Sequence, residues 1–286
     1  MKPFVKWAGG KTQILPHMKF PTDFSRYAEV FVGGGAVLYH VLEQFHPDKT
    51  YISDINAKLT NTYEHIRDHL PELLNILDEF QTQYENKSED IRAELYTGFR
   101  NTYNTTQDLL EQAALFIVLN KTCFNGLYRV NAHGLYNVPK GIYKNPQFYE
   151  LENLTEISKA LQDVEIHSGD FTDSYEFIKQ NPDQTFVYFD PPYRPLTQTA
   201  SFTSYAKNNF NDDEQIRLAQ YYKRLSDMGV KCLLSNSNPK NTNPEDNFFE
   251  DLFGEFTIEY VPASRMINSD GKKRGKITEI LVRNYD

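Results

Sequence analysis

Cysteine and long apolar stretches are scarce in this sequence. Only two of its 286 residues are cysteines, Cys123 and Cys232, and both lie far from any second group of metal-ligating side chains. This usage argues against a disulfide framework and a structural zinc site, and it favours a reducing cytoplasm. No apolar run approaches the roughly 18 residues of a membrane span, and the first residues, MKPFVKWAGGK, lack the apolar core of a signal peptide. We therefore predict a cytoplasmic protein that needs no membrane and no metal, and we expect it to be a monomer.

Positive charge is in deficit, since the formal net charge is -9. By itself this argues against nucleic acid as a partner. Two segments depart from the average: residues 121–149 carry basic side chains and no acidic one, and residues 265–276 set five basic side chains against Asp270. Either segment alone is typical of a solvated basic loop. Two of them in an acidic protein favour a surface that binds a polyanion.

The stretch KWAGGKTQIL, residues 6–15, ends like a phosphate-binding loop without completing one. The loop of a nucleotide hydrolase reads G-x-x-x-x-G-K-[ST], with a first glycine five residues before the second. Counting back from Gly10 gives Val5, which cannot serve as that glycine. The sequence therefore disfavours an ATPase, and the Trp, Gly and Lys residues of this stretch must have another role.

Strand-like runs alternate with helical patterns along most of the chain. Apolar residues at 3.6 spacing predict helices between about 57 and 118 and over 213–229, where Gly229 is the expected stop. The runs that predict strands are YAEVF, TYISD, VEIHS, TFVYF and VKCLLS, followed by a C-terminal hairpin. This alternation predicts an α/β fold whose mostly parallel sheet is covered on both faces. We predict one domain from residues 1–56 and 166–286, with residues 57–165 inserted as a second lobe.

FVGGGAV, residues 31–37, has the pattern of a tight turn between a strand and a helix. Glycines there let a ligand approach the backbone, and a helix N-terminus favours a negative group. The dinucleotide fingerprint would need glycine where Leu38 stands. Asp54, about 20 residues after the glycines and at the end of the next strand, is placed to accept from ribose hydroxyls. The N-cap of the following helix is the alternative role and suits Asp54 nearly as well. A glycine turn, an acidic strand end and no pyrophosphate site favour S-adenosylmethionine as the cofactor.

TFVYFDPPY, residues 185–193, is a buried strand that ends in Asp-Pro-Pro-Tyr. Prolines fix φ and remove N–H donors, so the backbone after Asp190 is rigid and its carbonyls are free to accept. Such a site suits an amino group, with one hydrogen on the Asp190 carboxylate, the other on the Pro191 carbonyl, and Tyr193 flat on an aromatic ring. Two acceptors on those hydrogens favour a tetrahedral nitrogen and aim its lone pair at an electrophile. We predict Asp190, Pro191, Pro192 and Tyr193 as the catalytic residues.

Together, these motifs resemble those of a known family. DPPY, FxGGG and an N-terminal KWxGGK are similar to the D12 class of N6-adenine DNA methyltransferases, in which the cofactor motif precedes the recognition domain and the catalytic motif. FNGLYRVNAHGLYNVPKG and PLTQTASFTSYAKNNF resemble the recognition and post-catalytic segments of the Dam-type, GATC-specific enzymes. The resemblance covers nearly the whole chain. It implies a Rossmann-like S-adenosylmethionine-dependent methyltransferase sheet with an inserted, mainly helical DNA-recognition domain.

The resemblance also implies roles for the cofactor residues. KWAGGK matches the N-terminal cofactor segment, so Trp7 and Lys11 are expected to line the S-adenosylmethionine site; the alternatives are a hydrophobic anchor and a surface charge. Asp54 would hold the ribose, and Asp170 with Phe171 the adenine. The expected cofactor-binding residues are Trp7, Gly10, Lys11, Gly33, Gly35, Asp54, Asp170, Phe171 and Asp190.

Double-stranded DNA is the partner that the resemblance implies. An adenine inside a duplex hides its amino group, so the base must be flipped out. Arg129 is the expected guanine reader, Phe124 stands where an aromatic ring can wedge into the base stack, and the basic segments would contact phosphates. The expected DNA-binding residues are Phe124, Asn125, Leu127, Arg129, Asn131, Pro139, Lys140, Arg265, Lys272, Lys273 and Arg274. Each of them also suits a structural loop residue.

Other functions remain open on the residues alone. DPPY chemistry does not choose the polymer, so an amine methyltransferase acting on RNA or protein is the alternative enzyme. A DNA-binding module without catalysis is disfavoured because Asp190 and both cofactor elements are intact. The sequence does not decide whether a companion restriction endonuclease exists.

Overall fold

The computed structural model describes residues 1–194, 210–264 and 276–286, with only the backbone of Ser264 and Lys276. Seven strands of this described chain form one sheet in the order β3-β2-β1-β4-β5-β7-β6. The first five strands of that order run parallel, and β7 pairs antiparallel with both β5 and β6. The strands are β1 Arg26–Glu29, β2 Lys49–Asp54, β3 Val164–Ser168, β4 Thr185–Phe189, β5 Lys231–Ser237, β6 Thr257–Ser264 and β7 Lys276–Arg283. The mostly parallel sheet and the C-terminal hairpin are therefore confirmed.

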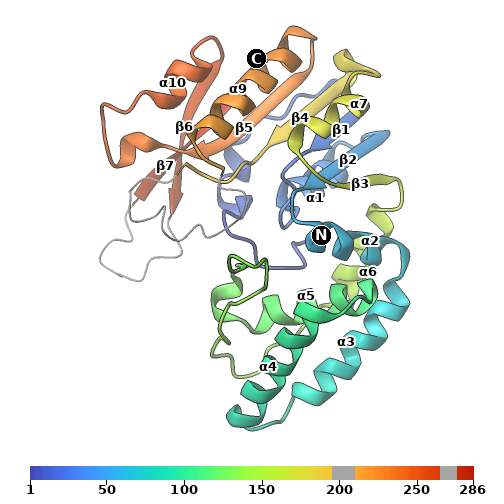
Figure 1. Cartoon of the computed structure of the whole chain (residues 1–286). Coiled ribbons are helices and arrows are strands. Elements are labelled where there is room, and N and C mark those ends of the chain that lie inside the picture. Colours follow the sequence, from blue (N-terminus) through green and yellow to red (C-terminus); the bar gives the residue numbers. More distant parts are fainter. Residues whose placement is uncertain (195–209, 265–275) are drawn as a thin grey trace.

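Helices cover both faces of the sheet (Figure 1). On β4, Phe186 and Tyr188 belong to one core while Val187 and Phe189 belong to the other, because successive side chains of a strand point to opposite faces. Side chains of α1 and α2 fill the first core, and those of α7, α9 and α10 fill the second. The helices are α1 Ala36–Gln44, α2 Ala57–Asp68, α3 Leu70–Tyr84, α4 Glu89–Thr105, α5 Leu109–Thr122, α6 Leu151–Ala160, α7 Tyr175–Ile178, α9 Asp212–Asp227 and α10 Phe248–Phe253. This is the Rossmann-like α/β fold that was predicted.

Helix α9 ends where the sequence indicated. Gly229, with φ +87°, lies just beyond its last residue, and the backbone N–H groups of Gly229 and Val230 bond back to the carbonyls of Ser226 and Leu225. A left-handed residue at this position is the usual way for a helix to satisfy its last carbonyls.

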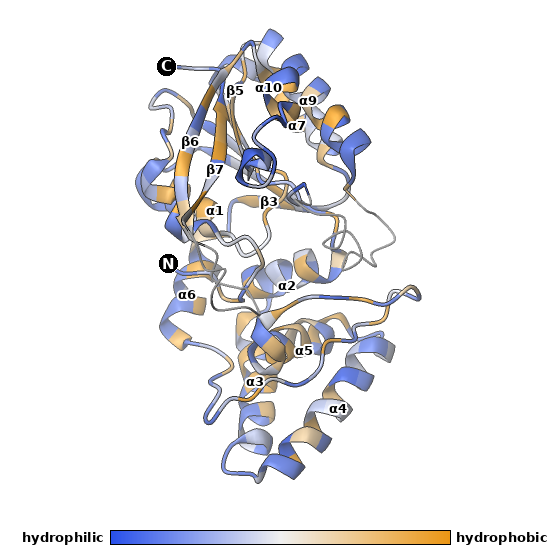
Figure 2. Cartoon of the chain, turned by 90° about the vertical axis from the view of Figure 1, so that its left-hand side faces the viewer, coloured by the Kyte–Doolittle hydropathy of each residue, from blue (hydrophilic) through white to orange (hydrophobic). Residues whose placement is uncertain are grey.

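Helices α3, α4 and α5 form a lobe on one side of the sheet (Figure 1). Every residue of α5 from Ala113 to Asn120 is buried, because a helix that is apolar on all sides must lie at the centre of its lobe. Figure 2 shows this contrast, with hydrophobic colour on α5 and on β5 and β7, and hydrophilic colour over much of α4. Helix α2 contacts both β2 and β3 and also α5, so it joins the two parts. The domain boundaries at residues 57 and 165 stay a prediction.

The carboxyl ends of four adjacent parallel strands meet at one edge. β1 ends at Glu29, β2 ends at Asp54, β3 is followed by Asp170, and β4 is followed by Asp190. This is the edge where open α/β sheets bind ligands. Within the described residues, no group of three or more metal-ligating side chains comes together and no helix is long and apolar enough to cross a bilayer.

Candidate active site

Asp190 is the centre of a group of buried polar side chains just beyond β4. Lys11 Nζ lies 2.7 Å from Asp190 Oδ1, and the hydroxyl of Ser235 on β5 donates to the same oxygen at 3.1 Å. The Lys11 side chain is only 4% exposed. Burial raises the pKa of Asp190, and the nearby charge of Lys11 opposes that rise. Within the described chain both partners contact Oδ1, so Oδ2 remains available as an acceptor.

The two prolines after Asp190 are held by a buried amide pair. Gln215 on α9 donates through Nε2 to the Pro192 carbonyl at 2.9 Å, and Asn236 on β5 donates to Gln215 Oε1 at 3.1 Å. No donor from the described residues reaches the Pro191 carbonyl. Of the two proline carbonyls, the one that was predicted to accept from a substrate is therefore the one left free.

Tyr193 lies beside the same lysine. Lys11 Nζ is 4.7 Å from the centre of the Tyr193 ring, and the Tyr193 hydroxyl donates to Glu279 on β7. Burial raises the pKa of Tyr193 well above its usual range, and the charges of Asp190 and Glu279 add to the rise, so the side chain is a neutral phenol. The ring is thus held by its hydroxyl and by the cation over its face, next to the free acceptors.

The glycine turn between β1 and α1 is closely packed. Gly33 and Gly35 have φ of +48° and +76°, in the left-handed region that favours glycine. A Cβ on Gly33 would lie 2.6 Å from Trp7 Cδ1, and one on Gly35 would lie 2.6 Å from the Tyr63 hydroxyl. The turn needs glycine at both positions for conformational and steric reasons.

Asp54 braces this turn from the end of β2. Its Oδ2 accepts from the Gly33 N–H at 3.1 Å, and its Oδ1 accepts from the Asn56 N–H at 3.0 Å. Burial raises the pKa of Asp54, and these two N–H groups oppose the rise. Asn56, whose side chain accepts from the Lys58 N–H, is the N-cap of α2. The alternative role of Asp54 as that N-cap is therefore wrong.

Trp7 packs on the turn with one side and on the helical lobe with the other. Its indole stacks with Phe116 of α5 at 6.2 Å between ring centres and with Tyr128 at 5.8 Å. It thus has the contacts of a hydrophobic anchor, yet it stays partly exposed next to the turn. Gly10 begins the short 3-10 helix Lys11–Gln13, where it has a negative φ. The cofactor contacts expected of Trp7 and Gly10 stay predictions.

Asp170 and Phe171 lie beyond β3 with a partner that the sequence did not indicate. Arg217 on α9 donates to both carboxylate oxygens of Asp170, at 2.8 and 2.6 Å, and its guanidinium lies 4.1 Å above the Phe171 ring. These hydrogen bonds lower the pKa of Asp170 to about 2. Arg217 was missed because its helical pattern gave no link to a residue 47 positions away. The expected adenine contacts of Asp170 and Phe171 stay predictions.

Glu29 is a second residue that sequence reasoning missed. It lies at the end of β1, is 2% exposed, and accepts from the Tyr27 hydroxyl at 2.6 Å. Burial raises the pKa of Glu29 to about 8, with a further contribution from the charge of Asp190. The signal was present in the sequence as a carboxylate within an apolar strand directly before the glycine turn, where a polar side chain is unusual.

The recognition residues predicted on the first basic segment lie on a loop after α5. Phe124 is 51% exposed, Asn125 has φ 55°, and Arg129 is exposed as well. Arg129 Nε donates to Asn137 Oδ1 at 2.8 Å, and its Nη2 donates to the Asn137 carbonyl at 3.2 Å. The arginine is therefore held within its own loop while its side chain stays open to solvent.

The other predicted contacts of this loop already have partners within the protein. Asn131 Oδ1 accepts from the N–H groups of His133 and Leu135, Leu127 accepts from Tyr136, the Pro139 carbonyl accepts from Phe124, and Lys140 pairs with Glu89 of α4. Each has the structural role that was the alternative, and its contact with DNA stays a prediction. Outside the described residues lie Arg265, Lys272, Lys273, Arg274 and most of PLTQTASFTSYAKNNF.

Comparisons with known proteins agree over nearly the whole chain. The family model of the D12 class N6 adenine-specific DNA methyltransferases matches residues 7–267. The chain is 44% identical over 296 residues to the Type II methyltransferase M.MjaIII of Methanocaldococcus jannaschii, covering 100% of this chain and 99% of that protein. It is 37% identical over 289 residues to the Type II methyltransferase M1.LlaDCHI of Lactococcus lactis subsp. cremoris, covering 100% and 96%. It is 32% identical over 282 residues to the DNA adenine methylase of Escherichia coli strain K12, covering 98% and 94%.

Proposed function

The chain belongs to the D12 class of N6 adenine-specific DNA methyltransferases, and from this premise we propose how it works. It transfers the methyl group of S-adenosylmethionine to the N6 amino group of an adenine flipped out of double-stranded DNA, at the sequence GATC. Family membership sets aside the ATPase, the binding module without catalysis and the methyltransferase acting on RNA or protein.

The observation that carries the mechanism is the one-sided pairing of Asp190. Lys11 and Ser235 both contact Oδ1, which fixes the carboxylate and leaves Oδ2 for a substrate. The Pro191 carbonyl is the second free acceptor next to it. Because these groups are positioned before any substrate arrives, little reorganisation is needed at the moment of reaction.

The residues around the glycine turn fit S-adenosylmethionine. Each Asp54 oxygen accepts one backbone N–H and can accept a second hydrogen bond, as a ribose hydroxyl requires. Gly33 and Gly35 keep the backbone of the turn bare, and Trp7 offers a partly exposed aromatic surface beside it. The residues that would hold the cofactor are Trp7, Gly10, Lys11, Gly33, Gly35, Asp54, Asp170, Phe171 and Asp190. When bound, S-adenosylmethionine supplies an electrophilic methyl group on a positively charged sulfur.

The remaining chemistry belongs to the chain itself. Asp190 Oδ2 and the Pro191 carbonyl accept the two hydrogens of the adenine amine, and Tyr193 stacks on the flipped base. Acceptors on both hydrogens withdraw the nitrogen lone pair from the ring and direct it away from the base plane. The raised pKa of Asp190 also makes its carboxylate a better base for the proton that the methylated nitrogen must release.

We assign the duplex to the helical lobe and the loop after α5. Phe124 is exposed and apolar, so it is suited to enter the base stack, and the exposed Arg129 has the fork of donors that reads guanine. The assignment of GATC depends on the resemblance of this loop to the Dam-type recognition segment. A companion restriction endonuclease is compatible with the Type II names of two relatives.

One assay tests both the activity and the sequence. Unmethylated plasmid is incubated with the protein and labelled S-adenosylmethionine, then digested with restriction enzymes that require or are blocked by N6-methyladenine in GATC. We expect incorporated label, resistance to the blocked enzymes and cleavage by the requiring ones. No label would reject the activity, whereas label at another sequence, located by sequencing of modified adenines, would reject GATC alone.

A further inference from the structure

Asn120, near the end of α5, bonds two segments that are far apart in the sequence. Its Oδ1 accepts from the Lys6 N–H at 2.8 Å, and its Nδ2 donates to the carbonyls of Lys6, at 2.8 Å, and Gly126, at 3.1 Å. The side chain is 4% exposed. One buried amide therefore ties the N-terminal KWAGGK segment to the loop after α5, and no other side chain of the described protein bonds to both.

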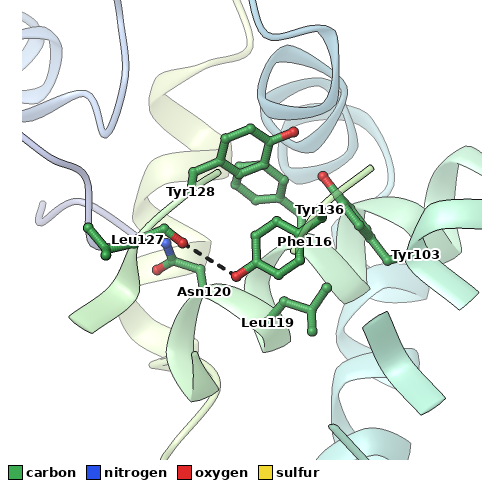
Figure 3. Close-up of a pocket in the computed structure, with 7 residues that line it drawn as sticks. All are labelled: Tyr103, Phe116, Leu119, Asn120, Leu127, Tyr128 and Tyr136. Atoms are coloured by element: carbon green, nitrogen blue, oxygen red, sulfur yellow. Dashed lines mark hydrogen bonds between the residues drawn. The ribbon is translucent and has the colours of Figure 1, made fainter. Parts of the chain in front are cut away.

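Tyr128 makes a second connection between the same two segments. Its ring stacks on Trp7 and packs on Phe116 at 5.5 Å between ring centres. Figure 3 shows Tyr128, Phe116 and Asn120 grouped around one small pocket of the lobe. Burial raises the pKa of Tyr128, the side chains of Tyr103 and Asn56 oppose the rise, and the charge of Asp54 adds to it.

The position of Tyr128 in the sequence gives this contact its meaning. Its neighbour Arg129 is exposed and bonded only to Asn137 in the described chain, whereas Tyr128 is directed inward against Trp7. Arg129 thus faces the side where DNA is expected, and its neighbour Tyr128 faces the side where the cofactor is expected. The N-terminal segment then continues from Trp7 to Lys11, the partner of Asp190.

We propose that Asn120 and Tyr128 are positioning residues that couple the reading of the DNA sequence to the binding of the cofactor. When Arg129 replaces its hydrogen bonds to Asn137 with hydrogen bonds to a DNA base, the loop after α5 shifts. Asn120 and Tyr128 contact both this loop and the N-terminal segment, so the shift moves Lys6 and Trp7 as well. A correct sequence then strengthens cofactor binding, and by reciprocity the cofactor strengthens binding of the correct sequence. This inference rests on the proposed function.

The test measures a coupling factor. The dissociation constant of S-adenosylhomocysteine, which cannot react, is measured by calorimetry on the protein saturated with the duplex that it methylates and with a scrambled duplex. We expect the wild-type ratio of the two constants to be at least about fivefold, the lower end of typical couplings. Asn120→Ala and Tyr128→Leu should bring it below twofold, whereas Tyr128→Phe, which keeps the ring, should retain most of it.

Asn104 provides the matched control. Its side chain also bonds to the N–H and the carbonyl of a single residue, Tyr136, at 2.8 and 3.0 Å, but it joins α4 to the loop without touching the N-terminal segment. Asn104→Ala should therefore keep the coupling factor. A wild-type ratio of one, or unchanged ratios in Asn120→Ala and Tyr128→Leu, would overturn the coupling while leaving methyl transfer intact. If Asn120→Ala fails to fold, Tyr128→Leu against Asn104→Ala decides.

Discussion

The edge of the sheet around Asp190 and the loop after α5 are organised in opposite ways. At the edge, titratable side chains are buried and bonded to one another: Lys11 to Asp190, and Tyr27 to Glu29. In the loop, Phe124 and Arg129 are exposed, and Arg129 is bonded only to its own loop among the described residues. The edge is fixed before substrate binds, while the loop must exchange its internal bonds for new ones.

This difference teaches where specificity and rate arise. A buried, pre-formed cluster suits chemistry, because charges held in a medium of low polarity act strongly and need no rearrangement. An exposed loop with replaceable internal bonds suits recognition, because a wrong sequence fails to replace them. We therefore expect substitutions at the edge to affect turnover or stability strongly, and substitutions in the loop to change discrimination more modestly.

The largest effect is expected at Asp190. Asp190→Ala should reduce methyl transfer about 10⁴-fold, the upper end of what one positioned proton-accepting group contributes, while the fold and much of the DNA affinity remain. Asp190→Asn should be nearly as damaging, because an amide is a weaker acceptor without charge. Single-turnover rates with labelled cofactor measure the effect. Turnover within tenfold of wild type would remove Asp190 from the mechanism.

Glu29 is expected to make the protein less stable at high pH, because its buried carboxyl group must then lose its proton. Its pKa in the folded protein is about 8 against an ordinary 4.5. Between these two pH values the folded state holds a proton on Glu29 that the unfolded chain has released. The contribution of Glu29 to the free energy of unfolding is therefore complete below pH 4.5 and is lost as the pH rises to 8. At 1.36 kcal/mol per unit the loss is at most about 5 kcal/mol. Urea unfolding at pH 6 and pH 8.5 should show that the free energy of unfolding falls less in Glu29→Gln than in the wild type. An equal fall in both proteins would exclude Glu29 as the source.

Two substitutions at the edge separate cofactor binding from chemistry. Lys11→Ala and Asp54→Ala should each raise the dissociation constant of S-adenosylmethionine at least about tenfold, since a hydrogen bond to a charged group is worth about 1.5 to 3 kcal/mol. DNA affinity should change less, and ATP should not compete. Only Lys11→Ala should also move the pH profile of turnover upward, because the charge of Lys11 holds down the pKa of Asp190. Calorimetry showing unchanged affinity in both variants would refute the cofactor site.

Arg129 tests whether the loop after α5 discriminates between DNA sequences. Arg129→Ala should cost about 1 to 3 kcal/mol of binding to the correct duplex and relax discrimination at one base pair. Asn137→Ala is the matched control, because it removes the internal partner of Arg129 but leaves the arginine itself. Competition binding with duplexes changed one base pair at a time measures both variants. Equal weakening on every duplex would show that Arg129 contacts phosphate and not a base.

The site residues at the edge of the sheet were largely predictable from the sequence. For the loop after α5, its position and its basic character were predictable, but its contacts were not. Asp54 ends a strand and Asp190 directly follows one, so the strand-like runs of the sequence placed both correctly. Ser235 and Arg217 were missed because their partners lie 45 and 47 residues away, and no local pattern encodes such pairs. Lys140 was expected to bind DNA, and its pairing with Glu89 was missed because a basic run shows charge without showing which acidic side chain will fold against it.

The smallest effect on DNA binding is expected at Lys140. Here the direction of the change in affinity is informative. If it binds phosphate, Lys140→Ala should weaken every duplex alike and lower the slope of log affinity against log salt by about one. Its pairing with Glu89 adds a second expectation: Glu89→Gln should free the lysine and strengthen binding to every duplex, again without changing discrimination. Both variants are measured by salt titration of binding to correct and scrambled duplexes. If both weaken binding, the Lys140–Glu89 pair holds the loop in place and Lys140 is no DNA contact. Opposite signs place Lys140 on the phosphates and make Glu89, whose side chain is the exposed member of the pair, its competitor.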